Sequence, residues 1–190
     1  MDRAEETRQQ IADAGYRCIA RWGVSRTTMA DLAREAGVSR ATLYRYFPGG
    51  REEVFAQSIN DAVVAFFRDL LAAVEGASSL EEMLEIGLPR AHRQVEEHEV
   101  LQAVLRNEPE ALHPALDDAV AAIRAQMASF LTDQLESFGV APGVAVPEAA
   151  DYLARMLLSY MGSPGRWDLD DPAEVQTLVR AELLGGIRPT

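Results

Sequence analysis

The sequence predicts an all-α fold in two domains, residues 1–50 and residues 51–190. Apolar residues recur at three- and four-residue intervals in almost every segment, as on one face of a helix, and we find no stretch that alternates like a strand. The charge is also divided: residues 1–51 carry nine Arg and six acidic residues, whereas residues 52–190 carry nine Arg and 24 acidic residues. A basic front on an acidic body indicates that only the first part faces a polyanion.

The composition is that of a folded protein from a reducing compartment. Hydrophobic residues make up 48% of the 190 residues, with 13 Gly and 9 Pro, which excludes collagen-like and disordered classes. The one cysteine, Cys18, provides neither a disulfide within the chain nor a zinc-finger pair. The longest stretch without Asp, Glu or Arg spans 11 residues, Ser137 to Pro147, whereas a membrane span needs about 20. We therefore expect a cytoplasmic protein.

Three helices are predicted in the first domain, at about residues 5–22, 28–36 and 39–47. The apolar face of the first consists of Ile11, Gly15, Cys18, Ile19 and Trp22. Thr28 and Asp31 have the spacing of a capping box at the start of the second helix, and Ser39 is a typical N-cap for the third.

The helical pattern continues through the second domain. Helices are predicted at Arg51–Val74, from a capping box at Ser79 and Glu82, at Val100–Arg106, from Pro114 to Phe138, from Pro147 to Met161, and from Pro172 to Leu183. Gly87 and Pro89 are expected to kink or end the second of these, because proline lacks the N–H that a helix interior needs.

The segment TTMADLAREAGVSRATLYRYF, residues 27–47, has the pattern of a helix-turn-helix. Ala33 is small where two helices cross closely, and Gly37 permits the left-handed backbone that the turn needs. Leu32, Val38 and Leu43 are placed to fill the wedge between the helices.

The exposed side of the second helix in this motif is polar, aromatic and cationic. Its residues are Arg40, Ala41, Thr42, Tyr44, Arg45 and Tyr46. Such a helix fits the major groove of DNA, where Arg reads guanine and small or hydroxyl side chains meet other base edges. The alternative is a pair of small core helices with a solvated charged face.

The order of these features closely resembles the DNA-binding domain of the TetR family of bacterial transcriptional regulators. The resemblance rests on a first helix ending at Gly23, followed by TTMADLAREAGVSRATLYRYFPGGREEVF, and covers about residues 7–56. It implies an N-terminal three-helix helix-turn-helix DNA-binding domain and a C-terminal helical ligand-binding and dimerisation domain. It also implies a homodimer on a palindromic operator, most simply a repressor, released when a small molecule occupies the helical body.

The resemblance assigns roles to individual residues. The groove helix would present Ser39, Arg40, Ala41, Thr42, Tyr44, Arg45 and Tyr46, with Thr28 and Tyr44 on phosphates. Arg51 stands where the family usually has a phosphate-binding Lys, because Gly50-Arg51 replaces the common Ser-Lys or Asn-Lys. A guanidinium can still hold a phosphate through a bidentate pair of hydrogen bonds.

The resemblance also implies an effector pocket in the body. From the aromatic, Met and His residues there, the candidates are Phe66, Phe67, His92, Met127, Phe130, Tyr152, Met156 and Tyr160. For each one, packing in the core is the alternative. This mixture of aromatic residues with few charges favours an apolar or aromatic effector.

The last two helices are apolar over a broad side, so they are either core helices or half of a four-helix bundle with a second copy. The candidate interface residues are Leu153, Leu157, Val175 and Val179.

Other functions have less support. His92 and Glu96 are four residues apart, but His92, His98 and His113 do not share a helical face, so we expect no metal site and no cofactor. We find no nucleophile elbow, P-loop or dinucleotide-binding fingerprint, and therefore expect no enzyme. Two alternatives stay open: a regulator whose body binds a protein or no effector, and a helical enzyme or carrier.

Overall fold

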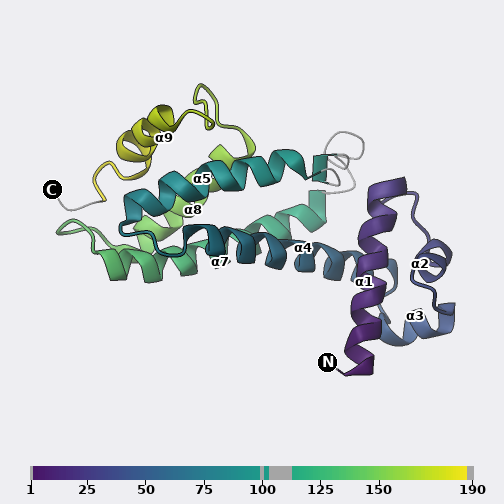
Figure 1. Ribbon diagram of the computed structural model, residues 1–190. Coiled ribbons are helices and arrows are strands. Elements are labelled where there is room, and N and C mark those ends of the chain that lie inside the picture. Colours follow the sequence, from purple (N-terminus) through teal and green to yellow (C-terminus); the bar gives the residue numbers. More distant parts are fainter. Residues whose placement is uncertain (1, 99–100, 103–112, 188–190) are drawn as a thin grey trace. The chain divides into compact units, whose positions relative to one another are not determined.

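The computed structural model describes residues 2–98, 101–102 and 113–187, with side chains from residue 120 onwards in the last range (Figure 1). These residues form helices and no strand, which confirms the all-α class. The helices are α1 (Arg3–Trp22), α2 (Met29–Glu35), α3 (Arg40–Tyr46), α4 (Arg51–Val74), α5 (Leu80–Glu97), α7 (His113–Phe138), α8 (Val146–Gly162) and α9 (Pro172–Leu178), with a π-helical turn at Val179–Leu183. The predicted helix at Val100–Arg106 lies largely outside the described residues.

The chain divides into two compact units. Among the described residues, the first contains residues 2–66, 98, 101–102 and 113–116, and the second contains residues 67–97 and 117–187. The contacts thus group the first part of α4 with α1–α3, whereas the sequence analysis places the boundary before this helix. None of the helices in the described ranges is long and apolar enough to cross a membrane.

The core of the first unit is built from α1–α4. Its buried side chains include Ile11 and Cys18 of α1, Leu32 of α2, Leu43 of α3 and Val54 of α4, each 0% exposed. Every helix of the helix-turn-helix is therefore fixed by burial of its apolar face rather than by helix propensity alone.

Gly15 marks a close crossing of α1 and α4, a role that the sequence analysis did not assign to it. A Cβ atom added at Gly15 would lie 2.5 Å from Oγ of Ser58 and 2.8 Å from Cγ1 of Val54. The buried Ser58 hydroxyl lies 2.7 Å from the carbonyl oxygen of Ala12 and 2.9 Å from that of Val54. The two helices approach closely only because residue 15 has no side chain.

Cys18 is expected to react slowly in the folded protein. Burial, reinforced by the Glu35 carboxylate, raises the pKa of its thiol to about 11. Because the thiolate is the reactive form, alkylation by iodoacetamide at pH 8 should be at least about 100-fold slower than in urea-unfolded protein. Equal rates, measured by mass spectrometry, would contradict this burial.

The raised pKa of Cys18 also makes the stability of the fold depend on pH. Because the folded state holds the thiol proton more tightly than the unfolded state, the stabilisation from Cys18 is complete below the ordinary pKa of 9.0. It is lost as the pH rises through about 11.

Of the two outcomes predicted for Gly87 and Pro89, a kink or a helix end, the structure excludes the end. Helix α5 continues past both residues to Glu97. Leu84, Leu88 and Ala91 are buried on one side of it, and this burial offsets the hydrogen bond that proline cannot donate. A Cβ atom at Gly87 would lie 3.3 Å from Cγ1 of Val74, so the glycine serves a close approach to α4 rather than a helix end.

The last helix is not a single α-helix as predicted. After α9 the chain widens into the π-helical turn Val179–Leu183, where the Leu184 N–H bonds the Val179 carbonyl oxygen at 2.8 Å. The predicted cap is present, since Asp171 Oδ1 accepts the Ala173 N–H at 2.8 Å. The consecutive residues Leu178 and Val179 are 0% exposed, and Leu183 and Leu184 are 0% and 1% exposed, so both ends of the wider turn lie in the core.

The candidate interface residues require a correction. Leu153 and Val179 are 0% exposed in the single chain, Val175 is 2% exposed and Leu157 is 8% exposed. They already form the core of this chain, so a second copy could not contact them to any useful extent. Both a core and an interface demand apolar residues, and the sequence does not distinguish these demands.

Candidate nucleic-acid interface and effector cavity

The helix-turn-helix is fixed by local hydrogen bonds at both of its helix starts. Thr28 and Asp31 form the predicted capping box: the Asp31 N–H reaches Thr28 Oγ1 at 3.2 Å, and Asp31 Oδ2 accepts the Thr28 N–H at 3.1 Å. Hydrogen bonds from Thr28, together with the charge of Arg34, lower the pKa of Asp31. Ser39 Oγ accepts the Thr42 N–H at 3.0 Å and so caps α3.

The turn between the helices has the predicted left-handed glycine. Gly37 has φ 66°, and the Val38 N–H bonds the Ala33 carbonyl oxygen at 3.0 Å around it. This is a Schellman-type helix end. It redirects the chain so that α3 can bury Leu43 and Phe47, both 0% exposed.

The opposite face of α3 is open to solvent. The structure leaves exposed Thr28, Ser39, Arg40, Ala41, Tyr44 and Arg45, and half-buries Thr42, Tyr46 and Arg51. Tyr44 is 45% exposed, a high value for a large aromatic side chain. Tyr46 is the least suited of the set to reading bases, because it packs against the core of the unit.

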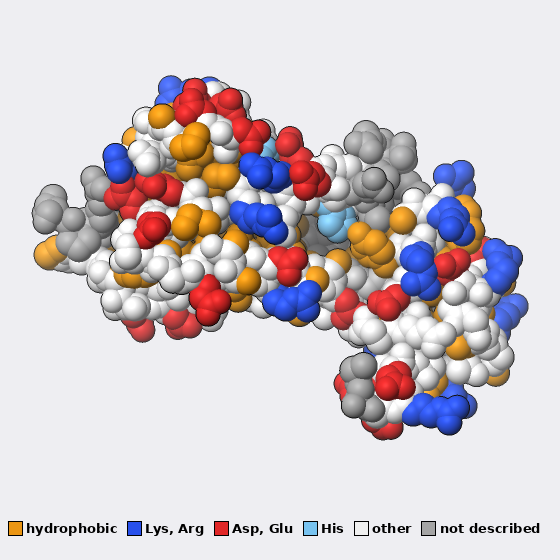
Figure 2. All heavy atoms as spheres, viewed as in Figure 1, with side chains coloured by type: hydrophobic (Ala, Val, Ile, Leu, Met, Phe, Trp, Pro, Cys, Tyr) orange, Lys and Arg blue, Asp and Glu red, His pale blue; other side chains and the backbone are white. Residues whose placement is uncertain are grey.

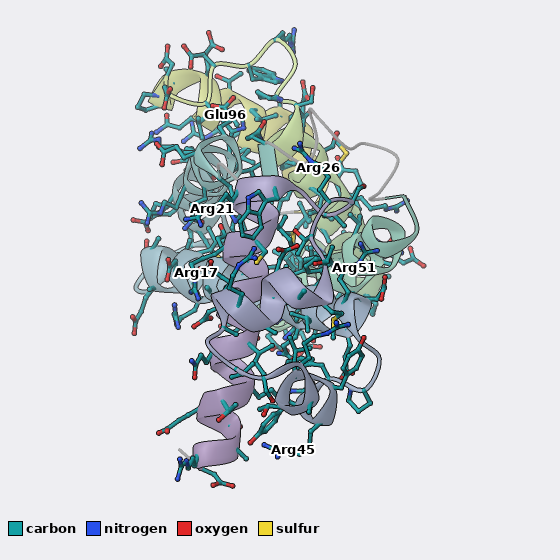
Figure 3. The ribbon with its side chains drawn as sticks, turned by 90° about the vertical axis from the view of Figure 1, so that its right-hand side faces the viewer. Arg17, Arg21, Arg26, Arg45, Arg51 and Glu96 are labelled. Atoms are coloured by element: carbon teal, nitrogen blue, oxygen red, sulfur yellow. The ribbon has the colours of Figure 1, made fainter. Side chains whose placement is uncertain are left out.

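The arginines of α3 differ from those around them in their pairing. On α1 and α2, Arg17 pairs with Glu35 at 2.7 Å and Arg34 with Asp31 at 2.5 Å. Within the described part of the chain, no carboxylate pairs with Arg40 or Arg45. Arginine side chains gather over the N-terminal helices on the face shown in Figure 2, and Arg45 points outward from α3 in Figure 3. The charge of α3 is therefore available to a polyanion.

A shallow depression beside α3 brings the three predicted phosphate contacts together. Thr28, Tyr44 and Arg51 line it, with the turn at Pro48–Gly50. The Arg51 Nη1 donates to the Thr27 carbonyl oxygen at 3.2 Å, and its Nη2 lies 3.0 Å from Oε1 of Glu52. These bonds hold the guanidinium at the rim of the depression, where it can meet a phosphate with part of its donors.

Replacing Arg51 by alanine should weaken DNA binding without changing sequence preference. A phosphate contact carries no base information, and its loss lowers the slope of log affinity against log salt by about 1 for each contact removed. Anisotropy titrations at several salt concentrations measure this slope. Arg51→Lys should retain most of it. A changed base preference with an unchanged slope would instead place Arg51 on a base.

Arg8 is a supporting residue that the sequence analysis missed. Its guanidinium lies 4.3 Å from the ring centroid of Phe47. Its Nη1 donates to the Tyr46 carbonyl oxygen at 2.7 Å, and its Nη2 lies 3.3 Å from Oε1 of Glu53. Arg8 thus fastens the end of α3 to α1 and α4. It lies three residues before Ile11 on the same helical face, but nothing in the sequence names its partners.

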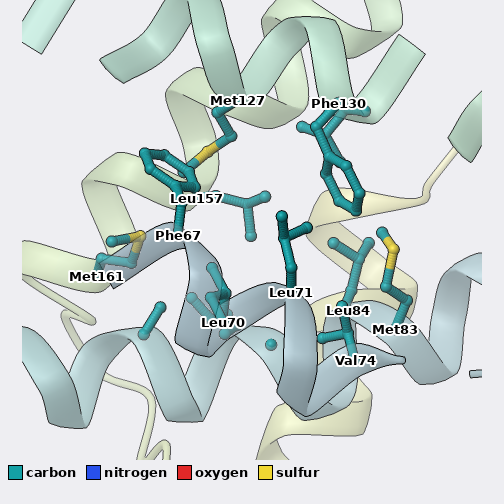
Figure 4. Close-up of a pocket in the computed structure, with 14 residues that line it drawn as sticks. Phe67, Leu70, Leu71, Val74, Met83, Leu84, Met127, Phe130, Leu157 and Met161 are labelled. Carbon is teal, nitrogen blue, oxygen red and sulfur yellow. The ribbon is translucent and has the colours of Figure 1, made fainter. Parts of the chain in front are cut away.

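An apolar cavity lies in the second unit (Figure 4). It is lined from α4 by Phe67, Leu70, Leu71 and Val74, from α5 by Met83, Leu84, Gly87, Leu88 and Ala91, from α7 by Met127, Phe130 and Leu131, and from α8 by Leu157 and Met161. Three of the predicted pocket residues are among them: Phe67, Met127 and Phe130. Apart from Gly87, the other residues that line the cavity are aliphatic residues and Met, which have the same sequence pattern as core residues.

The remaining five predicted pocket residues do not line this cavity. Phe66 belongs to the first unit, and Met156 is half-buried elsewhere on α8. His92 is engaged, with its Nδ1 2.8 Å from the Met161 carbonyl oxygen and its Nε2 3.5 Å from Glu96.

The two remaining tyrosines, Tyr152 and Tyr160, both bond Glu182. The Tyr152 hydroxyl donates to its carbonyl oxygen at 2.5 Å, and the Tyr160 hydroxyl donates to its carboxylate. That bond to the carboxylate, with burial, raises the pKa of Tyr160 to about 12. The two hydroxyls therefore link α8 to the π-helical turn.

No group of three His, Cys, Asp or Glu side chains that could hold a metal ion occurs among the described residues.

The capped helices, the left-handed turn and the open cationic face of α3 together define a helix-turn-helix DNA-binding protein. Residues 11–57 match the family described as bacterial regulatory proteins, tetR family. The chain belongs to the TetR family of transcriptional regulators.

Individual relatives agree with this assignment. The chain is 36% identical over 135 residues to the HTH-type transcriptional regulator TtgR of Pseudomonas putida, covering 70% of this chain and 62% of TtgR. A putative TetR-family regulator from Mesorhizobium loti has a similar fold, with a TM-score of 0.66, 19% identity and coverage of 94% of this chain and 98% of that one. The structure of a SmeT–triclosan complex is similar with a TM-score of 0.61, 20% identity and coverage of 92% and 90%.

Proposed function

We propose that this protein is a homodimeric repressor that binds a palindromic operator and is released from it by a small apolar or aromatic molecule. The observation that carries the DNA-binding part is the exposed face of α3, where Arg40 and Arg45 have no carboxylate partner among the described residues. Unpaired guanidinium groups on a groove-sized helix match both the phosphates and the base edges of DNA.

The dimer is proposed because one helix-turn-helix contacts only a few base pairs. A two-fold pair of α3 helices about 34–36 Å apart would enter successive major grooves and read an inverted repeat. The interface is assigned to the solvent-facing sides of α8 and α9, since their inner sides are filled by the chain itself. Tyr152, 36% exposed on α8, marks this side. The dimer would work in the cytoplasm, beside the DNA, without catalytic activity.

The release step is proposed as a shift between two states. An effector bound among α4, α5, α7 and α8 would favour a state whose groove helices are spaced wrongly for the operator. A coupling of about 1–3 kcal/mol would lower operator affinity roughly 5- to 150-fold. Helix α4 is the proposed lever, because it begins at Arg51 beside the DNA contacts and ends at Val74 in the cavity wall. The SmeT structure with triclosan supports a small-molecule effector.

A titration of the full chain against duplexes from the DNA flanking its own gene tests the proposal. Fluorescence anisotropy at modest ionic strength should give saturable binding, with two chains for each duplex by sedimentation. Candidate metabolites should lower the affinity and raise the Tm of the free protein. Binding of a single chain would refute the dimer, and metabolites that leave Tm and affinity unchanged would favour a protein partner or no effector.

A further inference from the structure

The cavity of the second unit is entirely apolar. All 14 residues that line it are aliphatic, Phe, Met or Gly, and they enclose about 60 Å³ of free volume. One water needs about 10–15 Å³ and two to four polar partners. The chamber therefore has room for several water-sized groups but offers them no hydrogen bond. Such a space stays dry and accepts a short alkyl chain or a single ring.

A second, more open depression adjoins this chamber and shares four of its walls. Leu71, Val74, Met83 and Phe130 line both spaces. Leu71 is 41% exposed, which places it at the boundary between chamber and solvent. Figure 4 shows Leu71 near the middle of the view, with Phe67 and Leu70 on one side of it and Phe130 on the other. A ligand with its apolar part in the chamber would therefore have its other end in the depression.

The depression differs from the chamber in its polarity. Glu75 and the amide of Gln134 line it, with the backbone of Gly76 and Ala77. Among the described residues that line it there is no Arg, and the Glu75 carboxylate makes no ion pair with another described residue. Glu75 directly follows the last residue of α4, so the negative end of the helix dipole points to the same place. Both charges favour a cation and oppose an anion.

We propose that the effector is a lipophilic amine, with its apolar part in the chamber and its ammonium group at Glu75. Only the role of this ligand as the effector rests on the proposed function. The preference of the site for an amine follows from the residues that line it. Gln134 would orient the head group through its amide oxygen, and Leu71 would have to move aside to admit the tail.

A series of ligands with one tail and three head groups tests the proposal. Hexylamine, hexanol and hexanoate are titrated into the full chain by isothermal calorimetry at pH 7 and low salt. The amine should bind about five-fold more tightly than the alcohol, the size of one solvent-exposed ion pair. Hexanoate should bind more weakly than both. Added salt should reduce the advantage of the amine, because exposed charges are screened.

Matched variants locate the site. Glu75→Gln should remove the preference for amine over alcohol, whereas Glu148→Gln, which loses the same charge outside both spaces, should retain it. Ala91→Leu fills the chamber and should weaken the binding of all three ligands by the same factor. If that variant does not fold, Gly87→Ala adds one methyl group to the same wall.

The outcomes separate this inference from the proposed function. The amine site is refuted if hexanoate binds as tightly as the amine, if no ligand of the series binds, or if Glu75→Gln leaves the preference for the amine intact. A preference for amine that depends on Glu75, found in a protein that the amine does not release from its operator, would support the site and refute its role as the effector site.

Discussion

Replacing Arg40 by alanine is expected to weaken operator binding by about 1–3 kcal/mol in each half-site, the value of one bidentate contact to a base. A homodimer loses the contact twice, so the whole effect is about 2–6 kcal/mol, or roughly 30-fold to 10⁴-fold in affinity. Arg40 is exposed on α3 and has no carboxylate partner in the described part of the chain. Its loss should therefore leave folding unaffected.

The measurement compares dissociation constants for the natural duplex and for duplexes changed at single positions. Arg40→Ala should lose its preference at one base pair in each half-site and retain it elsewhere. Arg90→Ala provides the matched control, since it removes the same charge from an exposed position on α5. Unchanged affinity and selectivity in Arg40→Ala would remove this residue from the set that reads bases.

Replacing Gly15 by valine is expected to destabilise the first unit by about 3 kcal/mol. The first added carbon would overlap Oγ of Ser58 and Cγ1 of Val54, and overpacking of this kind costs about 1–3 kcal/mol. Displacing the buried Ser58 hydroxyl from the Ala12 carbonyl oxygen adds the cost of a broken hydrogen bond. DNA binding should fail in parallel, because α1 and α4 hold the helix-turn-helix.

Thermal unfolding followed by circular dichroism measures this effect. Tm should fall by roughly 6–12 °C for a chain of this length. Ala20→Val, at an exposed position of the same helix, should shift it little. Gly15→Ala tests the sign, because this change usually stabilises a helix interior by about 0.5–1 kcal/mol but should here destabilise it. A raised Tm in Gly15→Ala would show that α1 and α4 do not approach closely at this point.

The sequence predicts the helix-turn-helix well because its signals are local. The caps at Thr28 and Ser39, and the turn at Gly37, each depend on residues within a few positions, and the structure contains all three. The boundaries of α4 were also predicted from its apolar face. The exposure of Ala41 and Arg45 follows from the same period, since each is two residues from the buried Leu43 and so lies on the opposite side of α3.

The cavity and the interface could not be predicted in the same way. Apolar residues at helical spacing face a core, a cavity or a partner with equal ease, and only tertiary packing decides which. Leu157 illustrates this, since it was assigned to an interface and instead lies in the cavity wall. Pro89 does not end its helix, because burial along α5 outweighs a local helix-breaking signal. The role of Glu75 depends on which residues surround it across three helices.

Selection from a pool of randomised duplexes tests whether α3 recognises a specific DNA sequence. The purified full chain is incubated with the pool at modest ionic strength, and the bound fraction is sequenced through several rounds. We expect an enriched inverted repeat whose half-sites are about 10 base pairs apart, centre to centre. With Arg40→Ala, we expect the base preference to be lost at one position of each half-site. A bound fraction with the base composition of the starting pool would contradict this recognition.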